Sequence, residues 1–354
     1  MKIAHIGSRG IPARYSGVEK SIEESSKHLI EQGFEISIYC HSKKTTLSYY
    51  NGIKLIPLPT INTKHLATMV HSFLSTIHVI FTNADIIHYH CIGPSMFSFV
   101  PRFFGKKTIV TIHALDWKRK KWNLLVRHLL KLCEIAAVYF PNKTIVVSRY
   151  LQNYFEHRYN KKVRFIPNGI NIAEESTSTR TGDYILFVGR LVPEKGLHYL
   201  IKAFNEINTE KELWIAGESS YTNRYVERLK EISGPKIKFL GPVYDKAGLD
   251  NLYKNCYLFV LPSEIEGCPP MALLEAMSFG KCCIVSDIPE CRENIFECVV
   301  SFKNEDYKDL GSVMERLLNN PQEVERMGKK AMLGIKEFYD WNKITQNLKN
   351  IYTS

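Results

Sequence analysis

Residues 261–280, LPSEIEGCPPMALLEAMSFG, decide the expected fold. They follow an apolar run, Leu258–Leu261, typical of a buried parallel strand, and pass through a Pro/Gly-rich turn into the helix pattern Met271–Phe279. Two glutamates, Glu266 and Glu275, flank this strand-to-helix turn. In open α/β sheets, ligands bind at the carboxyl ends of the strands, where a helix start offers free N–H groups to a phosphate. The stretch therefore predicts a nucleotide site.

A second strand end carries cations. The strand pattern Tyr184–Val188 is followed by GRLVPEKG at 189–196, which contains Arg190 and Lys195, and then by a helix pattern. Taken alone, the two glutamates of the first stretch would be interpreted as solvated surface carboxylates. Two cations at a second strand end change that interpretation, because together these groups suit a ligand that is both anionic and hydroxylated. A nucleotide sugar is both.

These motifs resemble the carboxyl-terminal half of glycosyltransferase family 4. The shared pattern is GR-x-x-x-EKG at 189–196, PS-x-x-EG and LLEAM-x-x-G within 262–280, and SDIPE at 286–290. The amino-terminal segment Gly7–Glu19, GSRGIPARYSGVE, resembles the subgroup that includes rhamnosyltransferases of bacterial surface-polysaccharide assembly. The resemblance covers nearly the whole chain. It implies the α/β GT-B fold, with two facing Rossmann-like doubly wound domains and an interdomain cleft, and a retaining, metal-independent sugar transfer.

Composition is compatible with this assignment. A chain of 354 residues with 45% hydrophobic and 23% charged residues suits two globular domains. The net charge of +11 indicates an anionic partner, which could be a phosphorylated substrate, an acidic membrane or nucleic acid. The nine cysteines form no CxxC pair and no signal-peptide pattern follows Met1, so we expect a cytoplasmic protein without a metal site.

Strand patterns alternate with helix patterns along the chain, which predicts parallel sheets. We expect a first, acceptor-side domain at 1–172, a polar Ser/Thr-rich linker at 173–182, and a nucleotide-sugar-binding domain at 183–334. The resemblance implies that the final helix, 335–354, packs back on the first domain. The apolar stretch His65–Thr82 is interrupted by histidines, so it predicts a core-facing helix instead of a membrane span.

A glycine-containing loop follows the first strand pattern, Lys2–Ile6. Gly10 and Gly17 would let the backbone approach a ligand closely, and Arg14 adds a positive charge. The alternative is an ordinary turn between a strand and a helix. The resemblance implies that this loop lines the cleft, with Gly10 near the donor and with Arg14 and Gly17 on the acceptor side.

His113 and Asp116 follow the strand pattern Thr108–Ile112. A single histidine at a strand end is more often structural than functional. The resemblance nevertheless implies that His113 hydrogen-bonds the donor sugar, and that Asp116 orients the acceptor or holds its loop. His88 and His90 occupy the end of the preceding strand pattern, where we expect core packing or a place in the acceptor pocket.

A basic segment precedes the helix pattern Leu124–Phe140. Four consecutive cations lie between two tryptophans, which is typical of an interfacial membrane contact. Each cation near an anionic lipid surface contributes about 1 kcal/mol, so we expect reversible, peripheral attachment to the inner face of the cell membrane. The alternative is a solvated basic helix face. The predicted contact residues are Trp117, Lys118, Arg119, Lys120, Lys121 and Trp122.

Sugar transfer requires that the leaving pyrophosphate be stabilised and that the acceptor hydroxyl be held near the anomeric carbon. Arg190 and Lys195 can neutralise the charge that develops on the phosphate, so we expect no metal or other cofactor. No carboxylate nucleophile is evident. Retention then implies attack on the same face of the sugar, with the donor phosphate accepting the proton of the acceptor.

The remaining donor contacts surround the two turns. Glu275 is expected to bind the ribose, Glu266 and the Gly267 backbone to position the sugar, and Gly189 to lie beside the donor. One feature departs from the family pattern. Glu266 and Glu275 are nine positions apart, one more than is usual, and Pro269-Pro270 between them removes two N–H donors. Either the turn bulges and keeps Glu266 in place, or the role of Glu266 is altered.

The sequence therefore predicts a glycosyltransferase that moves a sugar from a nucleotide donor to a glycan or lipid-linked acceptor in polysaccharide biosynthesis. Rhamnose is suggested by the amino-terminal loop alone. One alternative is a nucleotide-sugar epimerase of the same fold, which would turn over without an acceptor. Another is a non-enzymatic basic protein that binds membrane or nucleic acid. Nucleic acid is disfavoured, because no recognition motif is present and aromatic residues alternate with cations only at 117–122.

Overall fold

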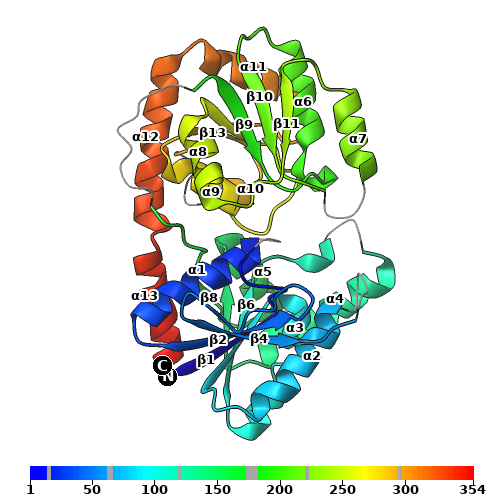
Figure 1. The fold of residues 1–354 in the computed structure, drawn as a ribbon, viewed down its shortest axis with the longest axis vertical. Coiled ribbons are helices and arrows are strands. Elements are labelled where there is room, and N and C mark those ends of the chain that lie inside the picture. The colour runs from blue at the N-terminus through cyan, green and yellow to red at the C-terminus, as the bar shows by residue number, and fades with distance from the viewer. Residues whose placement is uncertain are drawn as a thin grey trace. The chain divides into compact units, whose positions relative to one another are not determined.

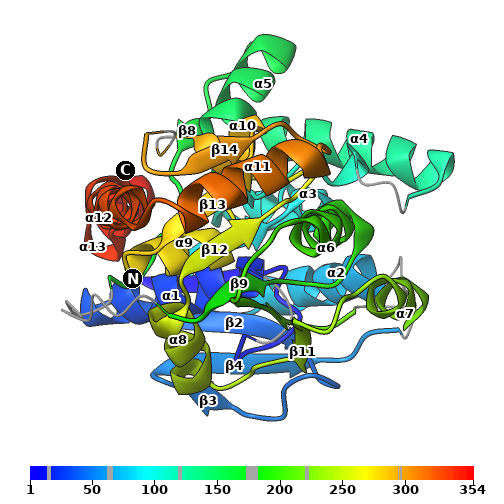
Figure 2. The ribbon, with the colours of Figure 1, turned by 90° about the horizontal axis from the view of Figure 1, so that it is seen from above.

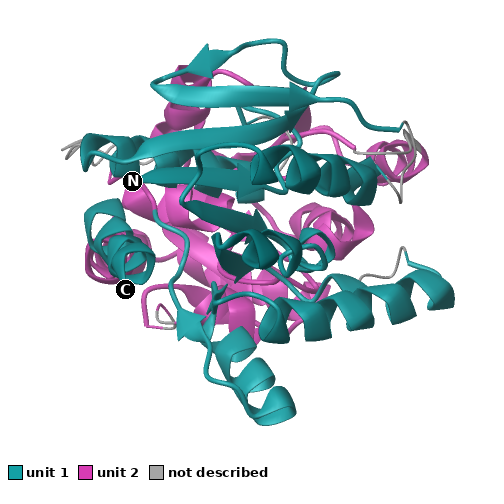
Figure 3. Ribbon diagram, turned by 90° about the horizontal axis from the view of Figure 1, so that it is seen from below, with its two compact units in different colours: residues 1–169, 341–354 teal, residues 170–340 magenta. Residues whose placement is uncertain are grey.

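The computed structural model describes residues 1–13, 17–61, 67–118, 122–172, 182–219, 223–293, 295 and 297–354. The chain forms two compact units, drawn in teal and magenta in Figure 3. Unit 1 comprises Met1–Gly169 and Trp341–Ser354, and unit 2 comprises Ile170–Asp340. The sequence predicted the two boundaries between the domains near residues 172 and 334. Of the expected linker at 173–182, only Gly182 lies within the described residues.

Unit 1 is built on an eight-stranded sheet with the order β3-β4-β2-β1-β5-β6-β7-β8, in which only the β3–β4 pair is antiparallel (Figure 1). Its elements are β1 (Lys2–Ile6), α1 (Gly17–Glu31), β2 (Glu35–His41), β3 (Tyr49–Tyr50), β4 (Ile53–Leu58), α2 (Ala67–Ile80), β5 (Ile86–His90), α3 (Ile92–Ser95), η1 (Val100–Phe104), β6 (Lys107–Ile112), η2 (Asp116–Lys118), α4 (Leu124–Tyr139), β7 (Lys143–Val146), α5 (Arg149–Tyr159), β8 (Arg164–Phe165) and α13 (Trp341–Thr353).

Helices cover both faces of this sheet. On β5, the His88 ring hydrogen-bonds the Tyr352 hydroxyl of α13 (Nδ1 to O, 2.8 Å), whereas the Tyr89 hydroxyl lies 3.0 Å from Thr76 Oγ1 of α2. Successive residues of a strand point to opposite faces, so α13 and α2 lie on opposite sides. The face under α13 and α1 is a core of isoleucines completed by Trp341 and Tyr352.

Helix α2 departs from the sequence prediction in one respect. It has a buried face, as predicted, but that face is mostly polar and contains His71, Ser72, Ser75, Thr76 and Val79. Thr76 and Ser75 satisfy their hydroxyls on backbone carbonyls one turn earlier. The large apolar side chains Phe73, Ile77 and Phe81 are exposed instead.

Unit 2 is built on a parallel six-stranded sheet with the order β11-β10-β9-β12-β13-β14. Its elements are β9 (Tyr184–Val188), η3 (Pro193–Lys195), α6 (Leu197–Glu206), β10 (Glu212–Ala216), α7 (Asn223–Glu231), β11 (Ile237–Gly241), α8 (Lys246–Asn255), β12 (Leu258–Leu261), α9 (Met271–Ser278), β13 (Cys282–Ser286), α10 (Pro289–Arg292), β14 (Val300–Phe302), α11 (Tyr307–Leu318) and α12 (Pro321–Phe338).

Each sheet has a point where the direction of winding reverses. In unit 2, the chain runs from β9 outward through β10 to β11, then returns to pair β12 beside β9 and runs outward through β13 to β14 (Figure 2). In unit 1, the corresponding neighbours are β1 and β5. In doubly wound folds, ligands bind beyond the carboxyl ends of the two strands at such a point. A ligand site is therefore expected at the turns that follow β9 and β12 in unit 2, and β1 and β5 in unit 1.

Among the described residues, no helix combines the length and the apolarity needed to cross a bilayer.

Candidate donor site and histidine cluster

Lys195 and Glu266 meet at the reversal point of unit 2. The Lys195 ammonium donates a hydrogen bond to Glu266 Oε1, and the two side chains are 14% and 13% exposed. Lys195 ends η3 after β9, and Glu266 lies in the turn after β12. The structure thus brings together two groups that the sequence placed at two different strand ends.

The two turns are held together by backbone contacts. Gly196 has a φ of +64°, and a Cβ atom there would lie 1.8 Å from the Pro262 carbonyl oxygen. Only glycine accommodates both the left-handed backbone and this close approach. The Glu264 N–H also donates to the Glu194 carbonyl (3.0 Å). Lys195 and Glu266 are consequently positioned by rigid backbone on both sides.

Arg190 and Gly189 occupy the start of the same turn. The Arg190 side chain is exposed. The Gly189 N–H donates to the Ala216 carbonyl (3.0 Å), and the Leu191 N–H donates to the Glu218 carbonyl (2.9 Å). These bonds fix the turn that carries Arg190 to the end of β10.

Glu275 lies in α9 and is buried. Its Oε2 accepts a hydrogen bond from the Tyr253 hydroxyl of α8 (2.9 Å), and Tyr253 is fully buried. Burial and the neighbouring Glu275 carboxylate raise the pKa of the Tyr253 phenol, so Tyr253 remains a donor. Glu275 is therefore held in one orientation by the helix packing of unit 2.

Glu266 contacts Lys195 in the turn between the two glutamates, nine positions before Glu275. Pro270 is the N-cap of α9, with extended backbone, and Pro269 is buried. The two prolines thus occupy the approach to the helix, where they interrupt no helical hydrogen bond. Gly267 is partly exposed next to Glu266.

Other groups around this turn were not predicted from the sequence. The Ser286 hydroxyl at the end of β13 donates to the Ser263 carbonyl (2.5 Å), and Asn304 Nδ2 donates to the Glu264 carbonyl (3.4 Å). The Glu264 carboxylate lies 3.8 Å from His198 Nε2 at the start of α6. Ser286 belongs to the SDIPE motif, so its presence was visible in the sequence, whereas Asn304 and His198 follow no motif.

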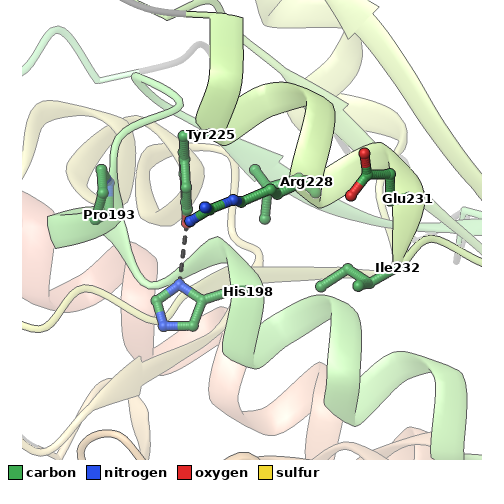
Figure 4. Close-up of a pocket in the computed structure, with 7 residues that line it drawn as sticks. Pro193, His198, Tyr225, Arg228, Glu231 and Ile232 are labelled. Carbon is green, nitrogen blue, oxygen red and sulfur yellow. Dashed lines mark hydrogen bonds between the residues drawn. The ribbon is translucent and has the colours of Figure 1, made fainter.

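A groove of about 430 Å³ lies between α6 and α7 (Figure 4). Its lining includes Tyr225, whose hydroxyl lies 3.0 Å from His198 Nδ1, and the side chain of Arg228. The groove reaches the donor turn only at Pro193 of η3. None of the predicted donor residues lines it, so it is a feature separate from the Lys195–Glu266 pair.

In unit 1, the loop after β1 is fixed by packing. Gly7 has a φ of +118°, and a Cβ atom there would lie 2.5 Å from the His90 carbonyl oxygen. A glycine is therefore needed at this position for the loop to pack closely against the end of β5. Gly10 is buried against Thr45 and Lys44. Arg9 Nε donates to the buried Glu19 carboxylate of α1 (2.8 Å).

Of the predicted acceptor-side residues, Gly17 is the exposed first residue of α1, and Asp116 is the partly buried first residue of η2. Arg14 lies outside the described residues, as do Arg119, Lys120 and Lys121 of the predicted membrane segment. The Trp117 indole donates to the buried Glu134 carboxylate (2.5 Å), and Lys118 Nζ donates to the Tyr150 hydroxyl (2.6 Å). Trp122 is partly buried. Trp117 and Lys118 therefore attach this segment to α4 and α5.

His113 belongs to a buried histidine cluster formed by His5, His88, His90 and His113. His5 Nδ1 lies 2.9 Å from His90 Nε2, and His90 Nδ1 lies 3.2 Å from His113 Nε2. His88 instead contacts the hydroxyls of Tyr352 and Thr111. Burial lowers the pKa of His113 to about 4, that of His5 to about 3, and those of His88 and His90 well below the ordinary range. All four rings are therefore neutral near pH 7.

The cluster adjoins a small cavity of about 30 Å³. His88, His90 and His113 line it from the sheet, and Ser21 and Asn168 line it from α1 and the segment after β8. The Ser21 hydroxyl donates to Asn168 Oδ1 (2.8 Å). Polar groups thus surround a cavity large enough to hold one water molecule.

Two family models match the chain in succession and together span residues 15–333. Residues 15–174 match the model described as Glycosyltransferase Family 4, and residues 170–333 match Glycosyl transferases group 1. The chain belongs to these glycosyltransferases. The second match contains both turns that carry Arg190, Lys195, Glu266 and Glu275, and the first contains the histidine cluster apart from His5.

Curated relatives of this glycosyltransferase include archaeal, bacterial and human proteins. An uncharacterized glycosyltransferase of Methanocaldococcus jannaschii is 25% identical over 76% of this chain and 75% of its own length. The lipopolysaccharide 1,2-N-acetylglucosaminetransferase of Salmonella typhimurium is 24% identical over 64% of this chain and 65% of its own. The UDP-Gal:alpha-D-GlcNAc-diphosphoundecaprenol alpha-1,3-galactosyltransferase of Escherichia coli is 24% identical over 81% and 80%.

Solved structures share the fold. Sucrose-phosphate synthase from Thermosynechococcus elongatus has a TM-score of 0.83 at 19% identity, covering 99% of this chain and 98% of that one. HepE from Anabaena in complex with UDP-glucose has a TM-score of 0.81 at 17% identity, covering 100% and 99%. These similarities confirm the predicted GT-B fold, with its two Rossmann-like domains.

Proposed function

We propose that this glycosyltransferase transfers a sugar from a uridine diphosphate sugar to a glycan or lipid-linked acceptor, with retention at the anomeric carbon. The observation that carries the proposal is the Lys195–Glu266 pair at the reversal point of unit 2, with Arg190 on the same turn. Cations here suit a diphosphate. The Escherichia coli relative named for UDP-Gal and a diphosphoundecaprenol acceptor, and the UDP-glucose complex of HepE, support uridine and a lipid-linked acceptor.

In this proposal, the bond between the anomeric carbon and the diphosphate oxygen breaks while the acceptor oxygen attacks the same face of the sugar. The acceptor proton passes to the departing phosphate. Arg190 and Lys195 neutralise the charge that develops on the diphosphate, so no divalent cation takes part in the leaving step. Glu275, held by Tyr253, binds the ribose hydroxyls.

Glu266 changes partners during this cycle. A phosphate oxygen that binds Lys195 competes with the Glu266 carboxylate, and a released Glu266 can accept a hydrogen bond from a sugar hydroxyl. Gly267 directly follows Glu266 in sequence, and Gly189 directly precedes Arg190; the Gly267 N–H and Gly189 complete the proposed donor contacts. In unit 1, neutral His113 can donate to a sugar hydroxyl, with Gly10 on the donor side and with Gly17, Arg14 and Asp116 facing the acceptor.

The proposal includes peripheral membrane binding, through an apolar patch on unit 1. Three elements expose large apolar side chains, among which Phe81 is 84%, Phe103 82% and Leu125 79% exposed. The Phe73 ring of α2 contacts Phe97, and the Phe99 ring, at the N-cap of η1, contacts Phe103 of η1 and Phe140 at the C-cap of α4. The apolar patch comprises Phe73, Ile77, Phe81, Phe99, Phe103, Phe104, Leu125, Leu129 and Leu132.

Within the patch, Phe73 and Ile77 are four residues apart, which places them on one side of α2, and Phe81 directly follows the end of that helix. Leu125, Leu129 and Leu132 form the same kind of stripe on α4. An exposed apolar patch suits the interface of an anionic bilayer on a chain of net charge +11, in which the basic sequence 117–122 directly precedes α4 in the chain. A lipid-linked acceptor would be presented at such a surface.

The function is tested by transfer from radiolabelled UDP-glucose, UDP-galactose, UDP-N-acetylglucosamine and dTDP-rhamnose to a heat-treated lipid extract, without added Mg²⁺ or Mn²⁺. The rhamnosyl donor is included because of the resemblance of the loop at 7–19. We expect transfer from one donor, about 100-fold slower in Arg190→Ala and unchanged in Lys246→Ala, an exposed lysine of α8. NMR of the product should show the anomeric configuration of the donor. Conversion of a nucleotide sugar without acceptor would instead indicate an epimerase.

A further inference from the structure

We propose that His5, His88 and His90 form a binding site for one divalent transition-metal ion of the zinc class, buried in unit 1. Each residue offers a ring nitrogen, and the three nitrogens lie within 4.8 Å of one another. The site is separate from the donor turns of unit 2. It also differs from the metal-free expectation drawn from the cysteines, because its ligands are histidines.

The backbone places these rings on one face of the sheet. His5 of β1 is in register with His88 of β5, and His90 lies two residues further along β5. Side chains two apart on a strand share a face, and register partners on neighbouring strands lie side by side. The ring centroids are 4.3–5.2 Å apart. Three histidines from two adjacent strands are a ligand set that zinc accepts, with a fourth position for water.

The ion would bind His5 through Nδ1, the nitrogen that faces His90, and would leave Nε2 as the second N–H of the ring. His5 is 1% exposed, and its Nε2 makes no hydrogen bond to any residue in the described parts of the chain. Buried polar atoms are rarely left without a partner. Its Nδ1 faces His90 Nε2 at 2.9 Å. Ligand nitrogens about 2.0–2.1 Å from a tetrahedral ion stand roughly 3.3 Å apart, so an ion can replace this hydrogen bond after a shift of a few tenths of an ångström.

Outer contacts are present for the other two ligands. His90 Nδ1 lies 3.2 Å from His113 Nε2. The two ring nitrogens of His88 face the Tyr352 and Thr111 hydroxyls at 2.8 and 2.7 Å, so His88 must give up one of these hydrogen bonds to bind the ion and keeps the other as its outer contact. A metal-bound histidine normally donates its second N–H to such a partner, which fixes its tautomer and orientation. With Nε2 of His90 on the ion, its Nδ1 must donate to His113 Nε2.

The cavity of about 30 Å³ beside His88 and His90 can hold the water that completes the coordination. The bound ion would tie β1 to β5 at the reversal point of unit 1. It would also set the tautomer of His113, which must keep its proton on Nδ1 when Nε2 accepts from His90. The ion therefore has a structural role and, through His113, a positioning role.

The test measures the metal content of the protein. The protein is purified without a histidine tag, stripped of metal with a chelator, and then equilibrated with one equivalent of Zn²⁺ or Co²⁺. We expect one ion per chain by elemental analysis and an intense visible spectrum with Co²⁺, typical of a low-coordinate site. X-ray absorption of the zinc form should show nitrogen ligands at about 2.0–2.1 Å.

Two ligand variants and one control localise the ion. His5→Val suits a buried parallel strand and should preserve folding while lowering affinity at least tenfold, as should His90→Asn. His71→Asn replaces a buried histidine outside the cluster and should bind like the wild type. Near-ultraviolet circular dichroism checks that each variant is folded. Wild-type protein that takes up no ion, or ligand variants that bind as tightly as the wild type, would overturn the proposal. Neither result depends on sugar transfer.

Discussion

Lys195 and Glu266 form an ion pair between residues 71 positions apart, on the turns after the neighbouring strands β9 and β12. Both side chains are largely buried. The pair links the turn that carries Arg190 and Lys195 to the turn that carries Glu266, at the point where the winding of unit 2 reverses. A phosphate that binds Lys195 must compete with Glu266, so donor binding and the position of Glu266 are coupled.

This coupling predicts that binding and turnover separate in two variants. Glu266→Gln removes the competing charge, so it should bind UDP at least as tightly as the wild type and transfer sugar about 100-fold more slowly. Lys195→Ala should lose both UDP affinity and turnover. Calorimetric titration with UDP and a transfer assay measure the two quantities. Weaker UDP binding in Glu266→Gln would show that the carboxylate does not compete with the phosphate.

Gly196→Ala should disorganise the donor turn. The left-handed backbone at a φ of +64° costs an alanine about 1–2 kcal/mol, and its Cβ would also lie 1.8 Å from the Pro262 carbonyl oxygen. We expect a lower Tm and a weaker response to UDP. Gly105→Ala is the matched control, because Gly105 has a φ of +71° with no atom within 4 Å of the added Cβ. An equal loss of UDP affinity in both variants would contradict the contact with Pro262.

Stability should fall in mild acid because of His41 and His71, whose ring centroids are 4.3 Å apart at an interplanar angle of 51°. Burial, together with the neighbouring His71, Arg9 and Lys44, which disfavour a positive charge on the ring, lowers the pKa of His41 to about 3. Burial lowers the pKa of His71 to about 4. The unfolded chain titrates near pH 6.5, so it binds more protons than the folded chain below that pH. The stability contributed by the neutral rings is complete above pH 6.5 and is lost as pH falls through 4 to 3.

Thermal unfolding of the wild type and His71→Asn between pH 7 and 5 measures this effect. We expect the Tm of the wild type to decrease more steeply with falling pH than the Tm of the variant. Parallel curves would show that these two histidines do not account for the acid sensitivity.

The apolar patch predicts lipid binding that depends on charge and on α4. Leu125→Glu should reduce sedimentation with phosphatidylglycerol vesicles several-fold, and high salt should weaken binding of the wild type. Leu333→Glu is the control, since Leu333 is an exposed leucine of unit 2, 65% accessible, outside the patch. Equal loss in both variants, or equal binding to uncharged vesicles, would contradict a specific anionic interface.

Much of the fold follows from local patterns in the sequence. Apolar runs such as Leu258–Leu261 and Cys282–Ser286 are strands in the structure as predicted, because parallel strands buried on both faces need continuous apolar sequence. The helices α5 (Arg149–Tyr159) and α11 (Tyr307–Leu318) were not predicted. Helix α5 is polar, and few of its residues are buried, so its apolar periodicity is weak.

The candidate site was only partly predictable. The motifs placed Lys195 and Glu266 at strand ends, but their pairing depends on β9 lying beside β12, which is a property of strand order. The histidine cluster depends in the same way on the pairing of β1 with β5. One indication of the cluster is visible in the sequence, because His5 is a polar residue within the apolar run Lys2–Ile6. The polar buried face of α2 was not predictable, because burial there is decided by tertiary contacts and by hydrogen bonds from hydroxyl groups to the backbone of the helix.

The central claim is that unit 2 binds the diphosphate of the donor through Arg190 and Lys195. The most direct measurement is the shift in Tm caused by UDP, dTDP, GDP and ADP in the wild type, Arg190→Ala and Lys246→Ala. We predict that UDP stabilises the wild type and Lys246→Ala equally and stabilises Arg190→Ala far less. If no diphosphate raises the Tm of the wild type, or if UDP protects Arg190→Ala as well as the wild type, the proposed donor site is wrong.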